Sequence, residues 1–227
     1  MEKLAIATMT FDKKGNAELM ESALEVLSKT NYPVYIADGG SSERFINSLK
    51  LMGHNVETVQ GGLTYQHKNS ILRASQNAYF VLYTEPDKYD WFVNGLEKSL
   101  NQYFAGKGVF AAISRTSEQM KTFPVHQREW EGKMNQIIED ETRIKGDFIY
   151  GPKLFSSSLG NQVKEIEGDK GWATLMFLVG RAHKMGLSIE NIYSASECPL
   201  NQRGEDNAEY REKQFNQNKE GFSLGLR

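Results

Sequence analysis

The chain has 227 residues, enough for one large domain or two small ones with a buried core. Its 27 basic and 29 acidic residues nearly balance, which argues against a broad basic face and so against nucleic acid as a partner. The single cysteine, Cys198, excludes an internal disulfide and suits a reducing compartment. No apolar stretch approaches the roughly 18 residues that span a bilayer, and the N-terminal segment is too polar for a signal peptide. We therefore expect a cytoplasmic protein with no integral membrane segment.

Short apolar runs alternate with longer helical patterns in the first half of the chain. The runs are strand-length and rich in β-branched or aromatic residues, and they cover residues 3–9, 32–38, 55–60, 78–84 and 108–114. Helical patterns lie between them at residues 16–30, 42–53, 67–77 and 89–106. In the second of these, Ser42 is a suitable N-cap and Gly53 a suitable stop. This alternation predicts an α/β fold with a mainly parallel (mixed) sheet flanked by helices.

The second half of the chain is mostly helical. Residues 118–145 are charged and helical in pattern, 146–155 give a short strand and turn, and 171–186 form an apolar helix. From Asn201 onward the sequence is polar, which predicts a solvated helix or a mobile tail at 201–227. We expect one domain at 1–200, with a nucleotide-sugar-binding half at 1–115 and an acceptor-side half at 116–200.

Small, hydroxyl-bearing and acidic residues follow the predicted strands. Ligands of open α/β sheets bind beyond the carboxyl ends of the strands, so these positions are candidate site residues. Turn composition alone also favours such residues, and that alternative stays open for each cluster. The positions are Thr8 and Thr10, then Asp38, Gly39, Gly40 and Ser41, then Gly61 and Gly62, then Glu85, Pro86 and Asp87, then Ser114 and Arg115.

The segment "TEPDK" holds two carboxylates on either side of Pro86. Residues i and i+2 of an extended segment point to the same side, and the proline keeps Glu85 out of helical geometry. Two carboxylates held together repel unless a cation lies between them. Glu85 and Asp87 therefore predict a Mg²⁺ or Mn²⁺ site bridged to phosphate oxygens. The alternative is a turn whose acidic residues favour the start of the next helix.

Three of these segments resemble nucleotide-sugar glycosyltransferases of the GT-A fold, especially family-2-like ones. "VYIADGGSSE" is similar to the strand of that family that ends in Asp-Asp-Gly-Ser, and "YTEPDK" is similar to its Asp-x-Asp motif with Glu in the first place. "HKNSILRAS" resembles the helix before that motif. The resemblance implies that Asp38 contacts the nucleobase, that Asp87 ligates the metal with Glu85 and that Arg73 lies near the nucleotide.

The base of inverting relatives is an acidic residue before an apolar helix, and "EGDKGWATLMF" is the matching segment here. The resemblance makes Asp169 the candidate base for an acceptor hydroxyl. Asp before a helix is also a preferred N-cap, and Glu165 and Glu167 are rivals for the role. Arg203 is a candidate clamp for the donor diphosphate or an ordinary surface arginine.

The sequence thus predicts a metal-dependent glycosyltransferase that moves a hexose from a nucleoside-diphosphate sugar to an unknown acceptor. Thr8, Thr10, Asp38 and Gly39 would hold the nucleoside, and Trp130 with Trp172 could form an acceptor platform. One alternative is a nucleotidylyltransferase, which needs a Gly-rich basic loop after the first strand, where only Lys13, Lys14 and Gly15 occur. Another is a non-catalytic sugar-nucleotide-binding module.

Overall fold

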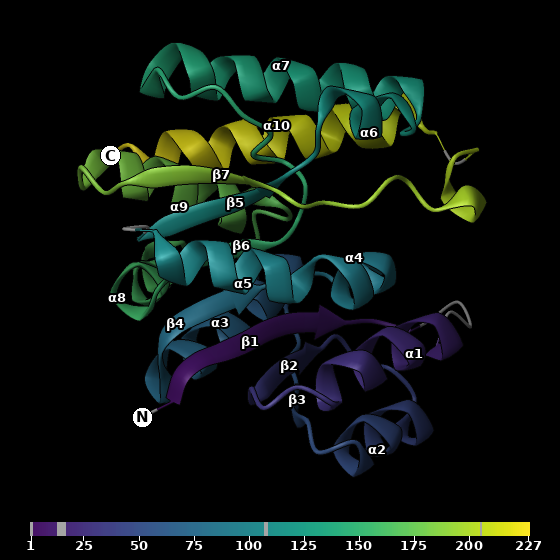
Figure 1. Cartoon of the computed structure of the whole chain (residues 1–227). Coiled ribbons are helices and arrows are strands. Elements are labelled where there is room, and N and C mark those ends of the chain that lie inside the picture. Colours follow the sequence, from purple (N-terminus) through teal and green to yellow (C-terminus); the bar gives the residue numbers. More distant parts are fainter. Residues whose placement is uncertain (1, 13–16, 107–108, 205) are drawn as a thin grey trace.

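The computed structural model describes residues 2–12, 17–106, 109–204 and 206–227 of the chain. Seven strands form one mixed sheet in the order β3-β2-β1-β4-β6-β5-β7 (Figure 1). The strands are β1 (Glu2–Thr10), β2 (Val34–Asp38), β3 (Asn55–Thr58), β4 (Ala78–Tyr83), β5 (Phe110–Ser114), β6 (Lys153–Ser156) and β7 (Ile189–Tyr193). The α/β prediction is therefore confirmed, and the first five strands lie where the apolar runs predict them.

The direction of each strand determines which strand ends and loops lie together at an edge of the sheet. β1 pairs in parallel with β2 and β4, and β2 pairs in parallel with β3. β6 is antiparallel to both of its neighbours, β4 and β5. The carboxyl ends of β1, β2, β4 and β5 consequently share one edge, and the start of β6 lies at that same edge because Tyr83 pairs with Lys153.

The helices follow the predicted segments with local differences. Ser42 caps α2 (Glu43–Leu51) by accepting a hydrogen bond from the Phe45 amide at 3.3 Å, as predicted. The pattern at 89–106 is divided at Gly95, and the one at 118–145 is divided before Pro124, which lacks an amide hydrogen. The first seven helices are α1 (Ala17–Ser28), α2 (Glu43–Leu51), α3 (Leu63–Asn77), α4 (Tyr89–Asn94), α5 (Leu96–Ala105), α6 (Ser117–Lys121) and α7 (Val125–Thr142).

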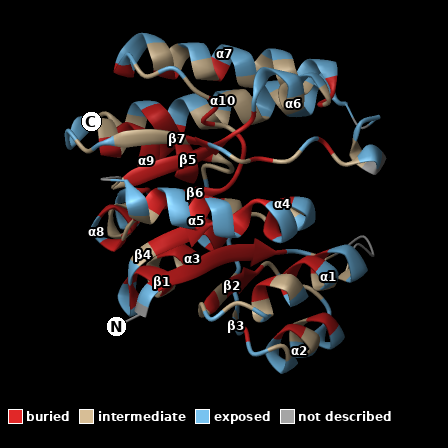
Figure 2. Cartoon of the chain, viewed as in Figure 1, coloured by how far each residue is buried: buried red, intermediate tan, exposed pale blue. Residues whose placement is uncertain are grey.

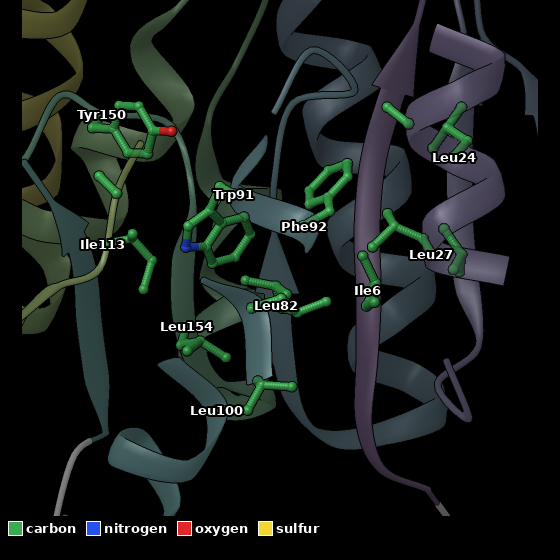
Figure 3. Close-up of a cluster of buried hydrophobic side chains, with 14 of the residues drawn as sticks. Ile6, Leu24, Leu27, Leu82, Trp91, Phe92, Leu100, Ile113, Tyr150 and Leu154 are labelled. Carbon is green, nitrogen blue, oxygen red and sulfur yellow. The ribbon is translucent and has the colours of Figure 1, made fainter. Parts of the chain in front are cut away.

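Each face of the sheet is covered by helices, which gives two apolar cores. On β1, Leu4 and Ile6 join one core while Ala5 and Ala7 join the other, because successive side chains of a strand point to opposite faces. Helices α1, α2, α4 and α5 cover the first core, and Figure 3 shows Leu24 and Leu27 of α1 facing Ile6 there. Figure 2 shows the buried strands between half-exposed helices.

The second core lies under α3, α8 (Ser157–Gly160), α9 (Ala173–Lys184) and the C-terminal helix α10 (Ala208–Gly225). The polar C-terminal segment thus forms a helix, one of the two predicted options, but one face of it is buried. Added Cβ atoms at Gly221 and Gly225 would overlap the backbone carbonyls of Ala173 and Phe177, so these glycines let α10 lie directly against α9. In Figure 1, α10 lies beside α7 as well.

None of the helices in the described part of the chain is long and apolar enough to cross a membrane.

Candidate active site

Asp38, at the end of β2, organises the loop that follows it. Its carboxylate is fully buried and accepts hydrogen bonds from the Thr10 hydroxyl at 2.8 Å and the Ser41 hydroxyl at 2.6 Å. The amides of Gly40 and Ser41 also donate to it, at 2.9 Å and 2.8 Å. These four donors join β1 to the loop after β2. The structure thus gives Asp38 a role in shaping the site, and its predicted contact with a nucleobase stays a prediction.

A cavity of about 800 Å³, called here the donor cavity, opens beyond the ends of β1, β2 and β4. Small residues make room for it: a side chain at Gly39 would overlap Gln66 and Phe11. Gly61 and Gly62 have φ angles of 106° and 108°, which favour glycine, and they turn the chain from β3 into α3. The lining residues include Thr10, Phe11, Gly39, Gly40, Gly61, Gly62, Gln66, Glu85, Pro86, Asp87, Trp172 and Gln202.

The predicted carboxylate pair lies at the mouth of this cavity, with an ammonium group between its members. Lys88 Nζ lies 2.8 Å from Asp87 Oδ1 and 3.9 Å from Glu85 Oε2. Burial raises the pKa of Glu85, and neighbouring Asp87 raises it further, while Lys88 opposes the shift. Glu85 Oε2 is buried without a hydrogen-bond partner. The chain therefore supplies its own cation to two carboxylates that would otherwise repel each other.

The Glu85 side chain has space because Gly151, two residues before β6, has no side chain. A side chain at Gly151 would overlap the Glu85 carboxylate, so this position must stay small. The fully buried Lys153 holds the turn by donating to the carbonyl of Tyr150 at 2.8 Å and that of Gly151 at 3.3 Å. Burial lowers the pKa of Lys153 to about 8, although nearby Glu85 acts in the opposite direction.

A second cavity of about 270 Å³, called here the acceptor cavity, also borders the carboxylate pair. It shares Glu85, Asp87, Trp172 and Gln202 with the donor cavity. Lys88 and Arg115 from the first half of the chain also line it. Most of the wall comes from the second half, and includes Gln127, Trp130, Glu131, Met134, Tyr150, Gly151, Met176, Tyr210, Arg211, Gln214 and Phe215. Two hollows thus meet at the carboxylates.

A buried ion triad supports the wall of the acceptor cavity. Arg115, which follows β5, binds Asp147 through Nε at 2.6 Å and through Nη2 at 3.1 Å. The same Nη2 lies 2.6 Å from Glu131 of α7. Burial alone would raise the pKa of Asp147, but the Arg115 guanidinium outweighs it and lowers that pKa. One guanidinium thus binds two carboxylates from separate segments, so the triad fixes α7 over the sheet edge.

Asp169 caps a helix, but not the one that follows it in the sequence. Its Oδ1 accepts from the amide of Thr64 at 3.0 Å, at the start of α3, and from the amide of Gly171 at 3.1 Å. Partial burial would raise the pKa of Asp169, and these hydrogen bonds lower it instead. The N-cap of α3 is Gly62, which has no side chain, so Asp169 supplies the missing acceptor from a distant loop. Its predicted role as a base stays a prediction.

The other predicted residues lie apart from the two cavities. Thr8 is fully buried in β1, and Arg73 of α3 lies 3.4 Å from Glu57. Arg203 donates to the carbonyl of Cys198 at 3.0 Å and pairs with Glu197 at 2.9 Å. The rival base Glu165 pairs with Arg181 at 2.6 Å, and Glu167 is exposed. The basic loop residues Lys13, Lys14 and Gly15 lie outside the described residues. Of the candidate residues named from the sequence, those that line the cavities are Thr10, Gly39, Gly40, Gly61, Gly62, Glu85, Asp87, Arg115, Trp130 and Trp172.

Sequence reasoning missed Lys88, Gly151 and Gln202. Lys88 directly follows the carboxylate pair, so its position alone is a signal that it could pair with them. Gly151 and Gln202 are far from that pair in the sequence, and only the antiparallel β6 and the loop after β7 bring them there.

The carboxylate pair meets part of what a divalent metal requires. Within the described residues, no group of three or more His, Cys, Asp or Glu side chains is arranged to hold a metal ion. A Mg²⁺-type site needs only one or two carboxylates when phosphate oxygens complete the shell. The unpartnered Glu85 Oε2 and the partly exposed Asp87 provide such ligands, since both line the mouth of the donor cavity.

Comparison with known proteins shows the fold. No protein-family model and no curated protein matches the sequence. Glucosyl-3-phosphoglycerate synthase from Mycobacterium tuberculosis, solved with Mn²⁺, UDP and phosphoglyceric acid, matches with a TM-score of 0.69 and 10% identity over 99% of this chain and 78% of that one. The same enzyme, solved with Mn²⁺, UDP-glucose and phosphoglyceric acid, matches with a TM-score of 0.64 and 12% identity over 99% of this chain and 80% of that one.

A structure described as a mycobacterial protein gives a TM-score of 0.61 and 13% identity over 89% of this chain and 70% of that one. Sequence identities this low show a shared fold and do not show a shared substrate. The chain therefore has the α/β fold of these structures, the GT-A type that the sequence resemblance predicts.

Proposed function

We propose that the protein is a metal-dependent glycosyltransferase that moves a sugar from a nucleoside-diphosphate sugar to a small hydroxyl acceptor. One observation carries the proposal: two cavities meet at Glu85 and Asp87, and the lining of one comes mainly from the first half of the chain, that of the other mainly from the second. A transferase needs this arrangement because donor and acceptor must approach the same reacting carbon from separate sites.

The donor cavity suits a nucleoside-diphosphate sugar in size and position. Its volume of about 800 Å³ lies in the range of small-molecule sites, and it opens beyond the strand ends. Thr10 and Gly39 are the predicted donor residues that line it. The M. tuberculosis synthase, which shares the fold, was solved with UDP and with UDP-glucose.

Asp87, with Glu85, would hold Mg²⁺ or Mn²⁺ at the donor diphosphate. When bound there, the cation would supply Lewis-acid stabilisation of the negative charge on the departing diphosphate. The Lys88 ammonium occupies the space between the carboxylates and would have to turn toward the phosphates. The synthase with the same fold was solved with Mn²⁺ and with Mg²⁺.

In the transfer, the acceptor oxygen forms the new bond to the anomeric carbon as the bond from that carbon to the diphosphate oxygen breaks. The bonding electron pair leaves with the nucleoside diphosphate, and the hydroxyl proton passes to a base, for which Asp169 remains the candidate. Trp130 and Trp172 line the acceptor cavity and offer faces on which a ring can stack. A cytoplasmic location stays a prediction from the cysteine content.

Calorimetric titration of UDP and GDP in Mn²⁺ and in EDTA tests the proposal. We expect Asp87→Asn to lower Mn²⁺-dependent affinity at least tenfold, because asparagine keeps the size of the side chain and loses its charge. Glu85→Asp should be tolerated, since it restores the commoner acidic pair. Asp90→Asn, at an exposed position three residues away, is the matched control.

Two results would contradict the proposal. If Asp87→Asn binds nucleoside diphosphate in Mn²⁺ as tightly as the parent does, the pair is a helix-initiating turn and not a metal site. If the parent binds donors without consuming them for any acceptor, the protein is a binding module. Pyrophosphate release from nucleoside triphosphates would instead indicate a nucleotidylyltransferase.

A further inference from the structure

Arg211, in the first turns of α10, lines the acceptor cavity without an acidic partner. Its Nη2 donates to the amide oxygen of Gln127 at 2.8 Å, and its Nη1 donates to that of Gln214 at 3.0 Å. No carboxylate in the described part of the chain forms an ion pair with it. Its Nε is buried and has no hydrogen-bond partner. Arg211 therefore contributes an uncompensated positive charge to the cavity.

The other cations of this cavity are already neutralised by the chain. Arg115 pairs with Asp147 and Glu131, and Lys88 pairs with Asp87 and Glu85. A guanidinium stays charged at every relevant pH, and a partly desolvated charge is stabilised by an anion. The difference between Arg211 and these two cations indicates that the partner of Arg211 arrives with a ligand.

The rest of the wall limits what that ligand can be. Trp130 packs against Phe215 at a centroid distance of 5.1 Å, and Trp172 faces both cavities. A volume of about 270 Å³ suits a small molecule or one small part of a larger one. Gln127, which bonds Arg211, also donates to Glu131 at 2.9 Å, so the guanidinium is held in one orientation.

We propose that the acceptor is a small hydroxy compound that carries a phosphate or carboxylate group, and that Arg211 binds this group. The inference rests on the proposed function and assigns its acceptor class. Arg211 would act as a binding and orienting residue that fixes the acceptor hydroxyl toward the shared carboxylates. Its planar fork of donors suits either anion, because both present two oxygens in one plane.

The experiment compares related acceptors with and without an anionic group. Glycerol, glycerate and glycerol phosphate form one series, and glucose with glucose 6-phosphate forms another. Binding without donor is followed by tryptophan fluorescence, since Trp130 and Trp172 line the cavity. Turnover is followed by release of nucleoside diphosphate from UDP- and GDP-sugars. The variants are Arg211→Gln and Arg211→Lys, with Arg44→Gln at an exposed position of α2 as the control.

We expect the parent to bind the anionic member of a series at least tenfold more tightly than the neutral one. Arg211→Gln should remove this preference and leave nucleoside-diphosphate affinity unchanged, Arg211→Lys should retain part of it, and Arg44→Gln should retain all of it. Preference for glycerol phosphate over glycerate would assign the group as phosphate, and the reverse as carboxylate.

Equal affinity for charged and neutral compounds in the parent, or an unchanged preference in Arg211→Gln, would overturn the inference. The two proposals can fail separately. Nucleoside-diphosphate binding and turnover without anion preference would leave the transferase proposal standing alone. Anion binding that depends on Arg211, in a protein that binds no nucleoside diphosphate, would support an anion site and refute the transferase proposal.

Discussion

Lys88→Met tests whether the ammonium group occupies the space that a metal ion would take. Methionine keeps much of the length and the apolar stem of lysine and removes the charged ammonium group with its hydrogen-bond donors. In the parent, Lys88 Nζ lies 2.8 Å from Asp87 Oδ1 and 3.9 Å from Glu85 Oε2. Without metal, the variant leaves the two carboxylates facing each other with no cation between them. With metal, it removes the competitor for that position.

The expected loss of stability depends on how far Lys88, Glu85 and Asp87 are exposed to solvent. A hydrogen bond to a charged group contributes about 1.5–3 kcal/mol, and breaking a fully buried pair costs about 3–5 kcal/mol. The Asp87 side chain is 37% exposed, so solvent replaces part of the lost interaction. We therefore expect a cost near the lower end, about 1.5–2 kcal/mol, or a fall in Tm of about 3–8 °C for a chain of this size.

The pH dependence has a definite sign. The pKa of Glu85 is raised in the folded protein by burial and by Asp87, and Lys88 opposes this rise. A carboxyl whose folded pKa is raised takes up a proton more readily when folded, so its destabilising effect grows as the pH rises from the unfolded value toward the folded one. Lys88→Met should raise the folded pKa of Glu85 further, so the pH range over which Glu85 destabilises the fold should extend to higher pH. The stability difference between variant and parent should therefore shrink in acid.

Thermal melts in EDTA and in Mn²⁺, at neutral and acidic pH, provide the assay. We expect the variant to melt lower in EDTA and to gain more from Mn²⁺ than the parent gains, with Mn²⁺ affinity at least tenfold tighter. Lys98→Met, at an exposed position of α5, controls for loss of a lysine. Equal melting in EDTA and equal Mn²⁺ affinity would refute the reasoning.

Three further predictions concern stability. Asp169→Ala should lower the free energy of unfolding by about 1 kcal/mol in urea titration, whereas Asp169→Asn should not, because only the alanine variant leaves α3 without a cap. Loss of transfer in the asparagine variant without loss of stability would identify a base. Gly221→Ala should cost about 1–3 kcal/mol by forcing α10 away from α9, and an unchanged melt would contradict that contact. His67 is fully buried between Tyr83 and Trp172, and this burial lowers its pKa to about 3. The free energy of unfolding of the parent should therefore fall as the pH drops below 6.5, and His67→Phe should reduce this fall if His67 is its cause.

The fold of the first half could be predicted because its local signals agree. Its strands are apolar runs between turn residues, except the mostly exposed edge strand β3. Its helices have an apolar face, as in α1 with Met20, Ala23, Leu24 and Leu27 buried. β6 shows the limit of this reasoning. A four-residue strand carries no information on its own direction, and its antiparallel insertion between β4 and β5 depends on contacts across the whole sheet.

The sequence predicts the site residues that directly follow a strand. It does not predict contacts between segments that are distant in the chain. Glu85 and Asp87 follow β4 directly, so their place at the sheet edge follows from the parallel topology. Asp38 stands at an equally clear strand end, yet its partners Thr10 and Ser41 are within reach only because β1 and the next loop converge on it. A position in the sequence does not reveal whether a carboxylate faces the ligand or the chain.

The acceptor side was harder to predict because its features rest on helix packing. The C-terminal segment is polar around most of its circumference, which is why the sequence favours solvation. Its docking depends on Gly221 and Gly225, where the absence of a side chain is the feature that matters, and on Phe222 between them, which is buried in the second core. Docking then places Arg211, almost three turns earlier, over the acceptor cavity beside Gln127 of α7. If α10 were a free tail, this charge would be solvated and without consequence. The contact that covers the second core thus also completes the acceptor cavity, so a variant that loosens α10, such as Gly221→Ala, should weaken binding of an anionic acceptor along with stability.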